Sequence, residues 1–302
     1  MTRPNSTWAA VLIPFALVTL IWGSTWIVIR DQLAVVPASW SVTYRFVLAG
    51  SVMSLVALVR GERFPRDRRG LGFATLTGLC QFAGNFNLVY RAEAHITSGL
   101  VAVVFALLLL PNALLARVFL GQRLGRQLLA GSAVAMAGVA LLILHQARSD
   151  PAGPREALTG VGFTVAAILA ASIANVSQAS ETARRYPMIA TVGLAMLIGA
   201  AADAALAWST TGPPVIEPRL GYFAGTAYLA LFASALAFPL YYQVLRVIGP
   251  AKAAYSSVIV PVIAMLLSTV FEGYRWSAVA VAGAVLTGVG LVIALSARRP
   301  AR

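Results

Sequence analysis

The residues of this chain that could do chemistry lie inside apolar runs long enough to cross a bilayer. The first run contains LVTLIWGSTWIVIR at positions 17–30, where a helix that only had to dissolve in lipid would be Leu, Ile and Val throughout. Trp22, Thr25 and Trp26 share one helical face by their i, i+3, i+4 spacing. We expect Trp22, Ser24 and Thr25 to line a wet cavity between helices. The alternative is ordinary helix packing, with Trp26 in an aromatic belt at the membrane surface.

Amide side chains interrupt two further apolar runs. The run at 71–91 and the run at 157–180 together carry Gln81, Asn85, Asn87, Tyr90, Ser172, Asn175 and Gln178. An unpaired polar group in hydrocarbon costs free energy, so such side chains face other helices or a cavity. We expect the same cavity to be lined by Asn85, Asn87, Tyr90, Asn175 and Gln178. The alternative is that the amides hydrogen-bond helices together.

Tyrosines near two prolines extend this candidate cavity. Tyr241 and Tyr242 follow Pro239, and Tyr255 precedes Pro261. Aromatic rings with a polar tip suit a pocket for an amphipathic small molecule. They equally suit the membrane–water interface, and this second interpretation remains open for Tyr255 in particular.

Two charges lie inside the apolar runs. Arg45 belongs to the run at 38–59 and Asp203 to the run at 187–209. A charge in hydrocarbon requires a partner or water, so both residues are functional candidates. Arg45 could attract the carboxylate of a substrate, or it could reach outward to the membrane surface. Asp203 is the candidate proton carrier.

Composition identifies the class of protein that must position these residues. The 302-residue chain is 59% hydrophobic and 11% charged, whereas soluble domains carry about 25% charged residues. We therefore expect an all-α polytopic membrane protein whose first partner is the lipid bilayer. The net charge of +13 comes from Lys and Arg in the connections between apolar runs, which favours membrane orientation over nucleic-acid binding. The single Cys80 excludes an internal disulfide and a cysteine metal cluster, and we expect no cofactor and no metal.

The apolar runs predict ten transmembrane helices. Charge clusters and Pro/Gly-rich breaks separate them, and they cover residues 8–29, 38–59, 71–91, 95–119, 126–147, 157–180, 187–209, 220–245, 251–271 and 276–297. Most of the basic residues in the connections fall on one side if the spans alternate. The positive-inside rule then predicts that both termini lie in the cytoplasm. We expect the protein to reside in the inner (cytoplasmic) membrane.

An internal repeat divides these helices into two sets of five. Pro111 and Pro261 stand 150 residues apart, and each is followed eleven residues later by Gln122 or Glu272. Glycine-rich runs follow each of them, AGSAVAMAGVALLIL at 130–144 and AGAVLTGVGLVIAL at 282–295. Small residues in these runs predict close helix packing, or a homodimer contact.

The repeat predicts halves at 8–147 and 157–297, joined by an extracytoplasmic connection at 148–156. Because five is odd, the second half must enter the membrane from the opposite side. The result is an inverted-topology repeat, an architecture that recurs in secondary transporters.

Three features of the sequence resemble the EamA branch of the drug/metabolite transporter superfamily. They are WGSTW at 22–26, YRFVLAG at 44–50, and the unit of a proline-containing helix followed by a glycine-rich helix, which occurs twice. The resemblance implies ten transmembrane helices, cytoplasmic termini, a central cavity and export of metabolites or drugs, with amino acids a common substrate class. The chain departs from the family at Gln122, where a Glu is frequent. Glu272 keeps the second-half counterpart, and its place at a helix end suggests a structural role.

Three classes of function can be weighed from these features. A carrier that moves a small organic solute by alternating access explains the cavity residues and the repeat. A multidrug exporter or a lipid flippase would share the architecture. A membrane enzyme would need a catalytic set near one membrane face, and none is visible in the sequence. A channel would show a pore helix or filter loop, which is also missing from the sequence.

Overall fold

In the computed structural model, the described residues, 4–122, 124–149, 153–248 and 256–296, contain helices and no strands. The first half comprises α1 (Pro4–Gln32), α2 (Ala38–Val59), α3 (Arg68–Thr77), η1 (Gly78–Asn85), α4 (Phe86–His95), α5 (Ser98–Phe105), η2 (Ala106–Leu108), α6 (Leu109–Leu120) and α7 (Arg126–Ser149). The second half comprises α8 (Pro154–Gln178), α9 (Glu181–Arg184), α10 (Met188–Thr211), α11 (Leu220–Ala230), η3 (Leu231–Leu236), α12 (Ala237–Ile248), α14 (Ser256–Phe271) and α15 (Ala278–Leu295). The described residues of each predicted span lie mostly in a helix or a run of consecutive helices, and residues 251–255 and 297 lie outside the described residues.

Two of these helical runs contain a π-helical stretch. η1 separates α3 from α4 in the first half, and η3 separates α11 from α12 in the second half. A π-helical turn inserts extra backbone into a helix, which redirects the side chains that follow, and such turns are frequent at functional sites. Both stretches border the centre of the bundle.

Seven helical segments within the described residues are long and apolar enough to cross a membrane. They are Ile13–Gln32, Ala38–Val59, Ser98–Leu120, Arg126–Arg148, Pro154–Gln178, Met188–Thr211 and Leu220–Val247. Ile259–Phe271 and Ala278–Ala294 are shorter apolar helices. The remaining run, α3–η1–α4, carries the amides that the sequence places at 71–91. The protein is a multi-pass, all-helical membrane protein.

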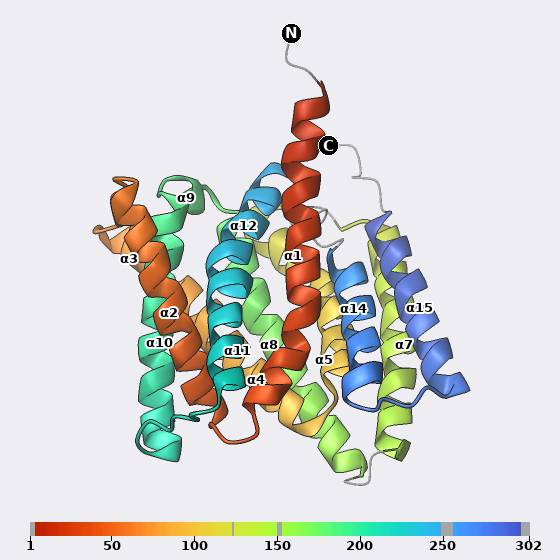
Figure 1. Ribbon diagram of the computed structural model, residues 1–302. Coiled ribbons are helices and arrows are strands. Elements are labelled where there is room, and N and C mark those ends of the chain that lie inside the picture. The colour runs from red at the N-terminus through yellow and green to blue at the C-terminus, as the bar shows by residue number, and fades with distance from the viewer. Residues whose placement is uncertain (1–3, 123, 150–152, 249–255, 297–302) are drawn as a thin grey trace.

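The helices form a bundle with one tight pair at each side and the remaining long helices between them (Figure 1). α2 packs along α10 at one side, and α7 packs along α15 at the other. Between them, α1 contacts α12 and α14, while α8 contacts α4 and α5. The beginning of α1 and the end of α15 lie at the same end of the bundle.

The α7–α15 pair depends on glycine. A Cβ built on Gly138 would lie 2.4 Å from the backbone nitrogen of Thr287, and one built on Gly290 would lie 2.2 Å from that of Ala135. Only a residue without a side chain allows two backbones to approach so closely. The predicted small-residue stripes of these two helices therefore pack against each other within the chain.

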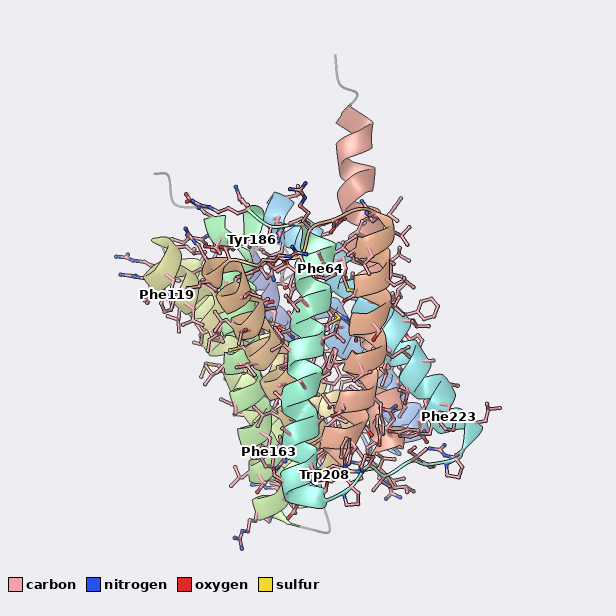
Figure 2. The ribbon with its side chains drawn as sticks, turned by 90° about the vertical axis from the view of Figure 1, so that its left-hand side faces the viewer. Phe64, Phe119, Phe163, Tyr186, Trp208 and Phe223 are labelled. Carbon is pink, nitrogen blue, oxygen red and sulfur yellow. The ribbon has the colours of Figure 1, made fainter. Side chains whose placement is uncertain are left out.

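Aromatic side chains mark both ends of the bundle (Figure 2). Phe119 lies towards the upper end, together with Phe64 and Tyr186, whereas Trp208 and Phe223 lie at the lower end. The side chains of Phe119, Trp208 and Phe223 are 71%, 62% and 49% exposed. Exposed aromatic residues at two levels are typical of membrane–water interfaces.

Candidate substrate cavity

A cavity of about 110 Å³ lies at the centre of the bundle, between helices of both halves. Six of the residues selected from the sequence line it, namely Trp22, Thr25, Arg45, Asn85, Asn175 and Tyr241. Other lining residues include Trp26, Gln81, Phe86, Phe105, Phe238 and Pro261. The π-helical stretch η1 contributes Gln81 and Asn85 to this wall.

Trp22 anchors an aromatic wall of the cavity. Its indole Nε1 donates a hydrogen bond to the carbonyl of Ala233 in η3, at 3.1 Å. Its ring lies 4.9 Å from the Tyr241 ring and 5.4 Å from the Phe238 ring, between centroids. On the other side of α1, a Cβ on Gly23 would lie 2.8 Å from the Ile263 side chain. Close packing through Gly23 and α14 thus fixes the helix that presents Trp22.

Arg45 is the charged residue of the cavity wall, and its side chain is only 1% exposed. Its Nε donates to the Ser234 hydroxyl at 2.9 Å, and Ser234 in turn donates to the carbonyl of Leu229. Its guanidinium carbon lies 4.3 Å from the centroid of the Phe86 ring, a cation–π contact. No carboxylate of the described residues forms an ion pair with Arg45.

Three polar atoms of the cavity wall lack a hydrogen-bond partner within the part of the chain that the structure describes. They are Nη1 of Arg45, Nε1 of Trp26 and Oδ1 of Asn85. Buried polar groups are normally hydrogen-bonded, so an unpaired group facing a cavity is available to water or a ligand. The cavity therefore offers one positive charge, one neutral donor and one acceptor, surrounded by aromatic rings.

The other selected residues that the structure describes do not line the cavity. Ser24 shares a hydrogen bond with the Tyr228 hydroxyl at 2.6 Å, and Tyr90 donates to Gln32 at 2.9 Å. Gln178 accepts from Arg246 at 3.2 Å. Tyr242 is fully buried, and Tyr255 is outside the described residues.

Asp203 and Asn87 form a separate polar cluster between α2, α4 and α10. Ser39 donates to Oδ1 of Asn87 at 2.6 Å, and Nδ2 of Asn87 donates to Oδ1 of Asp203. Both Asn87 and Asp203 are buried, and neither lines the cavity. No Lys or Arg of the described residues is paired with Asp203.

Sequence reasoning missed a buried acid, Glu93. The sequence places it beside Arg91 and His95 at the end of a predicted span, where a charged residue is expected to reach water. The structure leaves Glu93 0% exposed. Asp203 is therefore not the only acid inside the bundle.

Polar contacts close the bundle at the end opposite to the termini. Tyr90 donates to Gln32, and Gln32 donates to Thr226 at 2.7 Å, which links α4, α1 and α11. Glu272 accepts from the backbone and hydroxyl of Ser98 at 3.1 and 2.8 Å, at the start of α5. A carboxylate in this place satisfies free N–H groups of the helix N-terminus, which agrees with a structural role for Glu272.

The sequence profile of the EamA-like transporter family matches this chain twice, at residues 8–144 and 158–296. The chain belongs to the EamA-like transporter family. It is a membrane transporter by family. The name of the family describes its members as transporters, which are not enzymes.

Several relatives cover nearly the whole chain. The protein is 29% identical to the inner membrane transporter YedA of Escherichia coli strain K12, over 84% of this chain and 80% of YedA. It is 23% identical to PagO of Salmonella typhimurium, over 96% and 94% of the two chains. It is 26% identical to a probable terminal-alkyne amino-acid exporter of Streptantibioticus cattleyicolor, over 97% and 94%.

The fold is shared with a protein of known crystal structure. The TM-score is 0.69 at 22% sequence identity, and the match covers 95% of this chain and 96% of the other. At this identity the likeness concerns the fold alone. The arrangement of helices around the cavity is thus one that an experimentally determined protein also adopts.

Proposed function

We propose that this protein exports an amino acid or a related small metabolite across the cytoplasmic membrane, by alternating access around the central cavity. The observation that carries the proposal is the Arg45 guanidinium, which faces the cavity with Nη1 unpaired and with no ion-pair partner in the described ranges. A guanidinium with free N–H donors recognises a carboxylate. One of the relatives is named a probable amino-acid exporter, which agrees with this class of substrate.

The remaining atoms of the cavity suit the other end of an amino acid. Oδ1 of Asn85 is an acceptor for an ammonium N–H, and Trp22 and Tyr241 present aromatic rings that attract a cation. A zwitterion would thus place its carboxylate at Arg45 and its ammonium towards the amide and the rings. The aromatic residues around these groups leave room for an apolar side chain.

Ten spans in two inverted five-helix repeats provide the moving parts of the proposed mechanism. The π-helical stretches support the repeat, because Gly78–Asn85 and Leu231–Leu236 occupy corresponding helices of the two halves. Helix pairing supports it as well. α2 packs on α10 and α7 on α15, each with its repeat-related mate, while α1 contacts α12 and α14 as α8 contacts α4 and α5. An exchange of the two halves leaves this pattern unchanged, as an inverted repeat requires.

We further propose that the termini face the cytoplasm. Arg63, Arg66 and Arg69 lie before or at the start of α3, and Arg184 and Arg185 lie at α9, at the end of the bundle where α1 begins. An excess of arginine in short loops marks the cytoplasmic side. The Tyr90–Gln32–Thr226 contacts then lie at the extracytoplasmic end of the bundle, where they restrict access to the cavity from outside.

Counterflow in proteoliposomes tests the proposed function. Vesicles loaded with one unlabelled amino acid would accumulate the labelled form from outside above equilibrium, and the assay needs no knowledge of a coupling ion. We expect amino acids to compete, and the corresponding methyl esters, which lack the carboxylate charge, to compete at least tenfold less well. Equal competition by acid and ester would contradict the role of Arg45.

A multidrug or lipid exporter on the same scaffold is the alternative. A lipophilic cation would require an acid in the cavity wall, and the described lining residues include neither Asp nor Glu. Counterflow by lipophilic cations but by no amino acid would favour this alternative. Homodimer formation stays a prediction, measured by the mass of the purified protein in detergent.

A further inference from the structure

Glu93 is a buried acid whose carboxylate is unsatisfied. It lies on α4 near the end of the helix, with 0% exposure, and neither carboxylate oxygen has a hydrogen-bond partner among the residues described. An isolated buried carboxylate without hydrogen bonds is costly, and an ionisable residue at membrane depth is by default a functional candidate. Glu93 is therefore suited to gain and lose a proton rather than to hold a permanent charge.

The groups around Glu93 come from four helices and connect the cavity with the membrane surface. From α2, the Arg45 guanidinium lies over the ring of Phe86, which precedes Glu93 by two turns on α4, so its positive charge favours an ionised Glu93. From α1, Arg30 acts on it too, and its guanidinium donates to the main-chain carbonyl of Glu93. Glu272, after α14, contributes a negative charge and lies 3.9 Å from Arg30.

Three further titratable residues lie on α4, namely Tyr90, Arg91 and His95, and the first and the last have other partners. Tyr90, one turn earlier on α4, donates its hydroxyl proton to Gln32. His95, at the end of α4, is paired with Glu156 of α8. The charges that face Glu93 are thus Arg45 on the cavity side and the Arg30–Glu272 pair on the surface side.

We propose that Glu93 is the proton-binding site of the transporter, and that it takes up its proton when a substrate carboxylate binds Arg45. This inference rests on the proposed function. Without substrate, the positive charge of Arg45 offsets a negative charge on Glu93. A bound carboxylate neutralises Arg45, so the Glu93 carboxylate loses that stabilisation and binds one proton to become the neutral acid. By linkage, a protonated Glu93 in turn favours carboxylate binding by the same factor.

The proposal predicts a proton stoichiometry. Binding of an amino acid to the purified wild-type protein should take up close to one proton at a pH where Glu93 is ionised in the empty protein. The apparent affinity should then weaken about tenfold for each pH unit in that range. Calorimetry of binding in buffers with different ionisation enthalpies counts the protons directly, using the amino acid that gives the strongest counterflow.

The matched pair of variants is Glu93→Gln and Asp203→Asn. Both replace a buried carboxyl by its amide, but only Glu93 is reached by the charge of Arg45. Glu93→Gln should bind the amino acid with no proton uptake and with a pH-independent affinity, whereas Asp203→Asn should keep the wild-type uptake. Unchanged uptake in Glu93→Gln, or its loss in Asp203→Asn, would overturn the proposal.

Infrared spectroscopy tests the same group without a substrate. The C=O band of protonated Glu93 is the carboxylic-acid band that disappears in Glu93→Gln. In Arg45→Gln this band should persist to higher pH than in the wild type. A band with the same pH dependence in Arg45→Gln and in the wild type would also overturn the proposal. If no amino acid binds the wild type, the proposed function fails. If an amino acid binds without proton uptake, only the role of Glu93 fails.

Discussion

Two buried acids of this bundle, Glu93 and Asp203, stand in different surroundings. Glu93 lies between the cavity arginine and the Arg30–Glu272 pair, and both of its carboxylate oxygens lack hydrogen bonds within the described residues. Asp203 lies between α2, α4 and α10, where Asn87 donates to it and Ser39 holds Asn87. Glu93 thus has no hydrogen bond on either carboxylate oxygen, whereas Asp203 accepts one on Oδ1 and leaves only Oδ2 without a partner among the described residues.

The difference shows that burial of a polar group does not by itself identify a transport site. Asn87 and Asp203 are as deeply buried as Asn85, yet their contacts join helices. Asn85 and Arg45 instead line the cavity and keep unpaired atoms there, whereas the one unpaired oxygen of Asp203, Oδ2, belongs to a residue outside the cavity lining. A binding site for a solute requires polar atoms that the protein itself leaves without hydrogen bonds. If this is correct, substitutions at residues with such atoms in the cavity wall should impair transport more than substitutions elsewhere.

The largest effect is expected from Arg45→Gln. The variant removes the positive charge at the cavity wall while keeping a polar side chain of similar length. Loss of one partner of a buried charge pair typically costs 2–5 kcal/mol, so counterflow of amino acids should fall by at least about 30-fold. Arg219→Gln, in the exposed pair with Asp31, is the matched control and should transport normally. Equal losses in both variants would remove the distinction between the cavity and the surface.

A conservative substitution of Trp22 is expected to have a smaller effect than Arg45→Gln. Trp22→Phe keeps an aromatic ring beside Tyr241 but loses the hydrogen bond to Ala233. A hydrogen bond contributes about 0.5–1.5 kcal/mol net, so transport should fall about 3- to 10-fold. Trp22→Ala also removes the ring contacts and should abolish transport, measured by counterflow on protein that elutes normally in size-exclusion chromatography. The control is Trp208→Phe, an exposed ring on α10.

Much of this cavity could be predicted from sequence. The 3.6-residue helical period places Gln81 with Asn85 on one face and Asn87 with Tyr90 on another, and only the first pair lines the cavity. The sequence predicted that Asn85, Asn87 and Tyr90 would all line the cavity, and it could not decide which of the two faces borders it. That choice depends on Ser39 and Gln32, residues distant in sequence that satisfy Asn87 and Tyr90.

Other features were beyond sequence reasoning for physical reasons. The hydrophobic pattern of the sequence did not predict the π-helical stretches in α3–η1–α4 and α11–η3–α12, because it gives the length of an apolar run and not its local hydrogen-bond pattern. Glu93 was missed because charges cluster at span ends, and a one-dimensional pattern does not show that Arg30 and Glu272 cover it. The close approach of α7 and α15, by contrast, was evident from their glycines.

Asp203→Asn is expected to change transport little, by less than about 2-fold. The amide has nearly the same shape and volume as the acid, so the packing of α2 against α10 is preserved. Thermal unfolding in detergent should remain within a few degrees of the wild type. The notion of Asp203 as a proton carrier predicts the opposite outcome, a loss of pH dependence in transport. The two acids are then distinguished by one assay, a pH series of counterflow in Asp203→Asn and Glu93→Gln.

The smallest effect is expected from a third acid, the exposed Asp67 between α2 and α3. The Tyr186 hydroxyl donates to Asp67 at 2.6 Å and, first among the causes, holds the pKa of Asp67 below its ordinary value of 3.8. Because the folded pKa is lowered, this contact stabilises the fold above the ordinary pKa, and its contribution is lost as the pH falls through the lowered value. Tyr186→Phe should therefore unfold at a slightly lower temperature at pH 7, with the difference vanishing once the pH falls below the lowered pKa of Asp67.

The rate of transport should not depend on the exposed contact between Asp67 and Tyr186, because this contact is screened by water and lies outside the spans. Counterflow by Tyr186→Phe is expected to match the wild type at neutral pH. The contact does join the loop before α3 to the loop after α9, one from each half. A clear loss of transport with unchanged unfolding would therefore mean that the halves move against each other through these loops. Burial would then no longer separate functional from structural acids in this protein.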